Sequence, residues 1–128
     1  MAPRMERERA FEGPAVQGFG RFGFVIEGSE YRAALLTPEW AQEWSAPGLQ
    51  ALSEADISPL LDLEPRPEFV LLGTGEKTRF PPRALVKALD ERGIGVEAMD
   101  SRAAARTWSL LRTEDRWIVA ALMPLEQA

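Results

Sequence analysis

The chain of 128 residues contains no cysteine and no histidine. A disulfide framework, a Cys/His zinc site, a thiol nucleophile and a His-assisted serine triad are therefore all excluded. Long apolar runs are missing as well. The longest, FVLLG and WIVAALM, fall far short of the roughly 20 residues that cross a bilayer. No membrane span is expected, and most hydrolase templates do not apply.

Lysine is scarce, and the charge balance is acidic. Only Lys77 and Lys87 are lysines among the 15 basic residues, and the net charge is −5. A broad electrostatic contact with nucleic acid needs a basic surface, so no nucleic-acid partner is expected. The remaining basic residues are arginines, which favour bidentate contacts with carboxylates or other anions.

The amino terminus, MAPRMERERAFEG, is charged and lacks the apolar core of a secretory signal. Residues 1–11 are predicted to form a disordered tail, residues 12–124 a single domain and residues 125–128 a second tail. Export is not expected, and the sequence predicts a cytoplasmic protein.

The amino-terminal half predicts short strands followed by short helices. Three runs near residues 15–20, 22–28 and 31–37 are separated by glycine and predict a β-meander, which makes the sheet mixed or adds a small second sheet. Trp40 and Trp44 have the i, i+4 spacing that places both on one helical face, where core or lid packing is expected rather than a ligand cage.

A short helix is predicted over residues 53–62, because Ser53 and Asp56 form a weaker version of the capping box. A buried strand is predicted over residues 68–73, where EFVLLG is apolar without alternation.

A helix then begins near Pro81 and Pro82 and ends before Gly93. It is followed by a strand, a helix over residues 102–112 with Ser101 as its N-cap, and a final strand, WIVAALMP. The order strand, helix, strand, helix, strand predicts an α/β sheet with crossover helices.

One rim of this sheet is the candidate site, because ligands of open α/β sheets settle beyond the carboxyl ends of parallel strands. Gly73 and Gly75 allow backbone N–H groups to approach an anion, while Thr74 offers a hydroxyl and Lys77 a positive charge. The segment GTGEKTRFP matches neither the P-loop nor the dinucleotide fingerprint. The alternative is that glycine only permits a tight exit from the strand.

The same rim carries Asp100, Ser101, Arg106 and Thr107 at the start of the next helix. Asp100 is a candidate general base or a group that orients a ligand, provided that burial or arginine partners tune it. The alternative is structural: an acid beside a helix start complements the helix dipole and pairs with Arg102 or Arg106. No carboxylate cluster has the arrangement that a metal needs, and no cofactor is expected.

The blocks PEFVLLGTG, GIGVEAMDSRAAARTW and RWIVAALMP resemble the domain-of-unknown-function 498 family, which includes a mitochondrial complex I assembly factor. The resemblance covers residues 12–124. It implies a three-layer β/α/β-type domain, with a central mixed sheet flanked by helices, the last strand antiparallel to the others, and a small amino-terminal β-meander layer. The family commonly has Thr, Cys and Tyr or Phe where this chain has Ser101, Ala105 and Trp108.

No enzymatic activity is established for that family. The resemblance therefore implies a non-enzymatic binding or assembly module with protein partners such as respiratory-complex subunits or assembly proteins. The alternative is a binder of a small anionic ligand, or a weak enzyme, that uses the strand-end rim.

Overall fold

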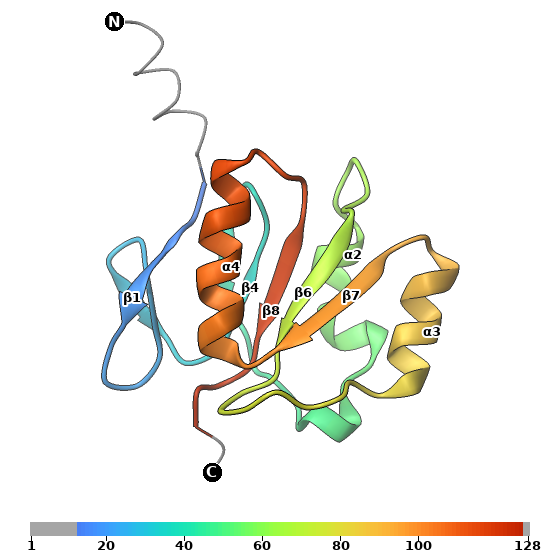
Figure 1. Ribbon diagram of the computed structural model, residues 1–128, viewed down its shortest axis with the longest axis horizontal. Helices are drawn as coiled ribbons and strands as arrows, with labels where there is room; N and C mark the ends of the chain where they lie inside the picture. Colours follow the sequence, from blue (N-terminus) through green and yellow to red (C-terminus); the bar gives the residue numbers. More distant parts are fainter. Residues whose placement is uncertain (1–12, 127–128) are drawn as a thin grey trace, which may run out of the picture.

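The computed structural model describes residues 13–126 and contains two β-sheets (Figure 1). The tail predicted at residues 1–11 lies outside the described residues, as do residues 127 and 128. The larger sheet has five strands in the order β5-β4-β8-β6-β7, and the smaller has the order β1-β2-β3. This mixed sheet with flanking helices and a small β layer confirms the predicted α/β fold class.

The carboxyl-terminal half alternates strands and helices as predicted. Its elements are β6 (Phe69–Gly73), α3 (Arg83–Glu91), β7 (Gly95–Met99), α4 (Ser101–Thr113) and β8 (Val119–Leu122). β6 pairs in parallel with β7 on one side and with β8 on the other. The strand of five apolar residues is thus the centre of the parallel part of the sheet, as its unbroken hydrophobicity predicts.

The resemblance implied that the last strand is antiparallel to all the others, and this is wrong for its pairing with β6. β8 runs parallel to β6 and antiparallel only to β4 (Ala34–Leu36). The reason is the connection: α4 follows β7 and returns the chain along the sheet, so β8 starts at the same end as β6. The sheet is mixed because β4 is antiparallel to β8.

The predicted third strand, residues 31–37, is in fact divided between the two sheets. β1 (Val16–Phe19), β2 (Phe24–Ile26) and β3 (Ser29–Tyr31) form the antiparallel meander. The chain then leaves this sheet at Arg32 and Ala33, and β4 joins the larger sheet. Both predicted alternatives therefore hold. The meander adds a small second sheet, and β4, which follows it in the chain, makes the larger sheet mixed.

The helix predicted around Trp40 and Trp44 is absent. β5 (Ala41–Glu43) occupies this segment and pairs with β4. The Thr37 hydroxyl oxygen accepts hydrogen bonds from the backbone N–H groups of Glu39 and Trp40, which turns the chain back as a hairpin. Residues four apart also share one face of a strand, so the spacing alone does not identify a helix.

The short helical segment predicted over residues 53–62 is present as two joined turns. A 3₁₀ turn covers Glu54–Ile57 and α2 covers Ser58–Leu61. The Asp56 carboxylate accepts from the Ser53 backbone N–H at 2.9 Å, as the capping box predicts. A further 3₁₀ turn, Leu49–Ala51, precedes it.

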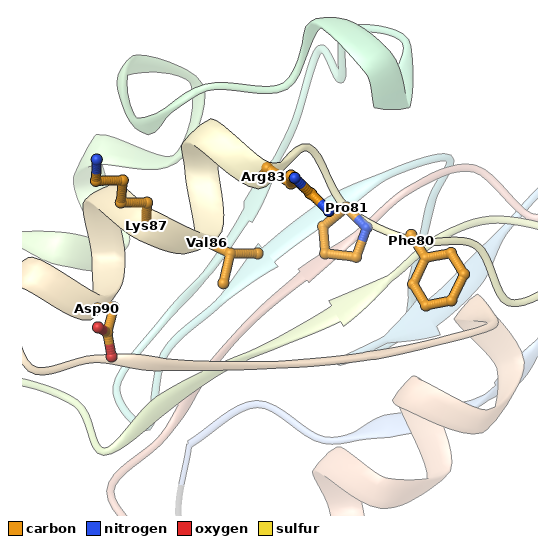
Figure 2. A pocket seen from close by; sticks show the side chains of 6 residues that line it. All are labelled: Phe80, Pro81, Arg83, Val86, Lys87 and Asp90. Atoms are coloured by element: carbon orange, nitrogen blue, oxygen red, sulfur yellow. The ribbon is translucent and has the colours of Figure 1, made fainter.

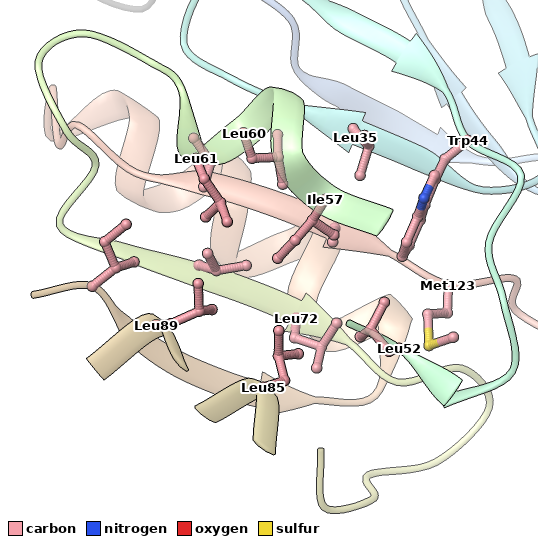
Figure 3. Close-up of a cluster of buried hydrophobic side chains, with 14 of the residues drawn as sticks. Leu35, Trp44, Leu52, Ile57, Leu60, Leu61, Leu72, Leu85, Leu89 and Met123 are labelled. Atoms are coloured by element: carbon pink, nitrogen blue, oxygen red, sulfur yellow. The ribbon is translucent and has the colours of Figure 1, made fainter. Parts of the chain in front are cut away.

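The two faces of the larger sheet are covered by different helices. On one face, α2, α3 and Trp44 pack on Leu35, Leu72 and neighbouring side chains (Figure 3). On the other face, α4 and the meander enclose Leu71, Ala120 and Leu122. Ala104 and Ala105 are fully buried, and such small side chains let α4 lie close to the sheet.

Three tryptophan indoles tie distant segments to the core. The Nε1–H groups of Trp44, Trp108 and Trp117 donate to the backbone carbonyls of Asp56, Pro14 and Pro65 at 3.1, 3.0 and 2.6 Å. Trp108 has no exposed surface. These indoles serve packing and anchoring, because a buried indole needs one acceptor and here has it.

Candidate functional site

The strand-end rim is a tightly packed corner between β6, β8 and α4. Ser101 is fully buried, and its hydroxyl accepts from the Gly75 N–H and donates to the Met123 carbonyl, both at 2.8 Å. A Cβ atom on Gly73 would lie 2.8 Å from the Ser101 Oγ. Glycine at position 73 is therefore required by the close approach of the helix start to the end of the strand.

Thr74 closes the loop that follows β6. Its hydroxyl donates to the Lys77 carbonyl at 2.7 Å and accepts from the Arg79 N–H at 3.1 Å, while its own N–H donates to the Met99 carbonyl at 2.8 Å. The backbone N–H groups of Thr74 and Gly75 thus donate within the protein. An anion at this loop would have to compete with these bonds, so the predicted anion contact stays a prediction.

Asp100, not Ser101, is the N-cap of α4. Its carboxylate accepts from the Ala103 N–H at 2.9 Å, and Ser101 is the first residue of the helix. The prediction of Ser101 as the cap is wrong because the helix begins one residue earlier than expected, which turns the serine hydroxyl inward. Among the described residues, no ion pair joins Asp100 to Arg102 or Arg106.

The structure brings Gly73, Thr74, Gly75, Asp100 and Ser101 together, but Arg106 lies elsewhere. Arg106 lines a shallow hollow beside β1. At 100° of rotation and 1.5 Å of rise per residue, six residues after the N-cap correspond to about 9 Å along the axis and a different side of the helix. Thr107 contacts the Met99 sulfur at 3.5 Å, and the Lys77 residue is exposed.

An apolar groove runs along α3, and the sequence analysis did not identify it. The Phe80 residue is 92% exposed and Val86 is 39% exposed. Figure 2 shows Phe80 and Pro81 where the chain enters α3, with Val86 on the next part of the helix. The lining residues are Phe80, Pro81, Arg83, Val86, Lys87 and Asp90.

The groove lies on α3 because only one side of this helix packs against the sheet. Leu85 and Leu89, four residues apart, are buried on the sheet. Arg83, Val86, Lys87 and Asp90 have the i, i+3, i+4, i+7 spacing of a second stripe, which has no core to cover. The sequence signal was Phe80, an aromatic residue that lies outside the buried stripe. Val86 gives no further signal in the sequence, because it stands next to Leu85 at a spacing that fits the buried stripe as well.

Charged groups border this groove without partners of their own. The ion pairs among the described residues are Arg92 with Glu54 and Arg116 with Glu68, both at 2.8 Å. Neither includes Arg83, Lys87 or Asp90. An apolar floor with charged edges is the usual composition of a protein-binding surface.

Within residues 13–126, no group of three acidic, histidine or cysteine side chains is placed to hold a metal ion. No helix in this part of the chain is long and apolar enough to cross a membrane.

Comparisons with known proteins converge on one family. The family model described as "Protein of unknown function (DUF498/DUF598)" matches residues 16–123. The chain is 35% identical over 111 residues to NADH dehydrogenase [ubiquinone] 1 alpha subcomplex assembly factor 3 from Bos taurus, covering 85% of this chain and 60% of that protein. The chain therefore spans about three fifths of the length of this relative.

Bacterial relatives match over nearly their whole length. An uncharacterised protein from Rhodobacter capsulatus is 32% identical over 130 residues, covering 100% of this chain and 97% of that protein. A crystal structure from Bordetella parapertussis superposes with a TM-score of 0.78 at 30% identity, covering 87% of this chain and 95% of that one.

Proposed function

This chain belongs to the DUF498/DUF598 family of unknown function, and from that membership we propose that it is a non-enzymatic binding module that holds a protein partner during assembly of a larger complex. The similarity to a named NADH dehydrogenase assembly factor supports an assembly-type role. The finer proposal is that the partner is a respiratory-complex subunit or another assembly protein, and that the α3 groove contacts it.

The observation that carries this proposal is the exposure of Phe80. An aromatic side chain that is 92% exposed contributes little to folding, because it buries almost no surface. Aromatic residues commonly serve as anchors at the centres of protein interfaces. With Pro81 and Val86 beside it, Phe80 forms an apolar surface bordered by charged side chains that make no ion pair within residues 13–126, which suits a partner segment better than a small solute.

The absence of cysteine and histidine from the sequence fits a binding role, since the commonest nucleophile and base pairs are missing. At the rim, the polar groups of Ser101 and Thr74 are engaged in internal hydrogen bonds. The cytoplasmic location remains a prediction.

An affinity enrichment from the native host tests the proposal. The tagged chain and its Phe80→Ala variant are compared, and co-purifying proteins are quantified by mass spectrometry. We expect respiratory-complex subunits or assembly proteins to be enriched by the wild-type chain. Their recovery should fall at least about tenfold with the variant, because truncation of an aromatic anchor commonly costs about 2 kcal/mol or more.

Leu110→Ala is the matched control. Leu110 is 60% exposed and also apolar, but it lies on α4 and outside the groove. Its replacement should leave the recovery unchanged. Recovery of no membrane-complex subunits and no assembly proteins would overturn the assembly role, whereas equal losses with Phe80→Ala and Leu110→Ala would overturn only the assignment to α3.

A further inference from the structure

A second hollow, lined by three arginines, lies beside the first turn of α4. Arg21 comes from the loop between β1 and β2, Arg32 from the link between β3 and β4, and Arg102 from the helix. The other lining residues are Gly20, Phe22, Pro124, Leu125 and Glu126. In a chain with a net charge of −5, three guanidinium groups gathered from three separate segments are an unusual concentration of positive charge.

Aromatic rings lie against two of these arginines, Arg21 and Arg102, without neutralising their charge. The Arg102 guanidinium carbon lies 5.5 Å from the centre of the Phe19 ring, and that of Arg21 lies 5.6 Å from the Phe22 ring. Such stacking restrains a guanidinium group while its N–H donors stay available. Neither of the ion pairs found among the described residues includes Arg21, Arg32 or Arg102.

The loop that carries Arg21 is itself fixed. The Gly20 N–H donates to the Gly23 carbonyl at 2.8 Å, which forms a tight turn. The Glu30 carboxylate accepts from the Phe22 N–H. A Cβ atom on Gly20 would lie 2.7 Å from a Glu30 carboxylate oxygen, so this carboxylate holds the loop from a position beside the hollow.

Charge and size define the ligand that this hollow fits. Three arginines and one carboxylate, Glu126, line the hollow, and the Glu30 carboxylate lies beside it, so the positive charges outnumber the negative ones by at least one. The hollow has a volume of about 60 Å³, and a water molecule takes up roughly 30 Å³ of liquid volume. A compact anion fits these limits, and arginine binds phosphate oxygens through paired N–H donors. A nucleotide base or sugar would have to remain outside.

We propose that Arg21, Arg32 and Arg102 form a binding site for a phosphate group, either as the free ion or as a small phosphate monoester. The site is next to the predicted rim, because Arg102 follows Ser101, whose hydroxyl donates to the Met123 carbonyl beside Pro124. It uses Arg102 in place of Arg106. It is independent of partner binding at the α3 groove, which lies on a different helix.

Nuclear magnetic resonance of the full ¹⁵N-labelled chain tests this site. The backbone amides and the arginine Nε–Hε signals are followed while inorganic phosphate, glycerol phosphate or acetate is added at constant ionic strength. We expect saturable shifts confined to Arg21, Arg32, Arg102 and their neighbours. At least one phosphate species should bind at least about tenfold more tightly than acetate. A phosphate group carries more negative charge than acetate and offers the guanidinium groups more acceptor oxygens. The tighter of the two phosphates identifies the free ion or the monoester as the ligand.

Arg102→Gln and Arg106→Gln form the matched pair of variants, because both are exposed arginines one turn apart on α4 but only Arg102 lines this hollow. Arg102→Gln should weaken phosphate binding at least about tenfold, because it removes a charged hydrogen-bond donor, while Arg106→Gln should not change it. The thermal unfolding midpoints of both variants confirm that the fold is intact. Shifts that do not saturate, that spread over all arginines, that acetate reproduces equally, or that Arg106→Gln removes instead would each overturn the proposal.

Discussion

At the scale of single residues, Ser101 stabilises the corner that the sequence had suggested as a site. Its hydroxyl joins the loop after β6 to the end of β8, and the side chain is fully buried. Asp100 beside it is a helix cap. The cap accounts for an acid at the helix start, since its carboxylate satisfies an otherwise unpaired N–H, whereas the predicted pairing with Arg102 or Arg106 is not found among the described residues.

Replacement of Ser101 by alanine should destabilise the protein by about 2–4 kcal/mol, because the Gly75 N–H and the Met123 carbonyl would both lose their buried partner. Urea unfolding followed by tryptophan fluorescence measures the change. Ser109→Ala is the control, since the Ser109 hydroxyl makes only a 3.5 Å contact to Val16 and its loss should cost less than about 1 kcal/mol. Equal costs for the two variants would show that the corner does not depend on the serine.

At the scale of elements, α3 has a buried side and an exposed side that serve different purposes. Leu85→Ala should lower the free energy of unfolding by about 2–5 kcal/mol, because it leaves a cavity under the helix. Phe80→Ala should change it by less than about 0.5 kcal/mol, because that side chain is almost entirely exposed. Urea denaturation of both variants measures the change in the free energy of unfolding. A large loss of stability from Phe80→Ala would mean that the ring packs on the protein and is not available to a partner.

The elements from β6 onward could be predicted from the sequence, because each has a long apolar pattern and a clear start or stop residue. The amino-terminal strands could not be bounded so well. Each has only three or four residues, and the i, i+4 spacing of Trp40 and Trp44 fits a strand as well as a helix. The sequence predicted that the residues after β6 and β7 would lie close together, and they do, but Arg106 lies elsewhere because its side of α4 depends on where the helix begins. The role of the rim as a binding site stays a prediction.

At the scale of the whole molecule, one ion pair links the start of β6 to the turn between α4 and β8. The Glu68 carboxylate and the Arg116 guanidinium group lie 2.8 Å apart. The hydrogen bond from Arg116 lowers the pKa of Glu68, and the nearby positive charge acts in the same direction. A carboxylate with a lowered pKa stabilises the folded state above its unfolded pKa, and this contribution is lost as the pH falls through the folded pKa.

Glu68→Gln should therefore reduce stability slightly near neutral pH and have no effect in strong acid, where the wild-type carboxyl group is protonated as well. The loss should stay below about 1 kcal/mol, since both side chains are partly exposed and solvent screens the pair. Urea unfolding midpoints across the acidic pH range measure it, with Glu43→Gln as the control, because Glu43 is exposed and belongs to neither ion pair found among the described residues. A difference that persists unchanged in strong acid would rule out the ion pair as its cause.

The central claim is that the α3 groove contacts an assembly partner, and site-directed photo-crosslinking in the native host tests it most directly. A photoreactive side chain is placed at position 80 and, as the control, at position 110, both of which are exposed. Mass spectrometry then identifies the cross-linked proteins. We predict that position 80 captures respiratory-complex subunits or assembly proteins and that position 110 does not. Capture of the same proteins from both positions, or of none from position 80, would contradict the account.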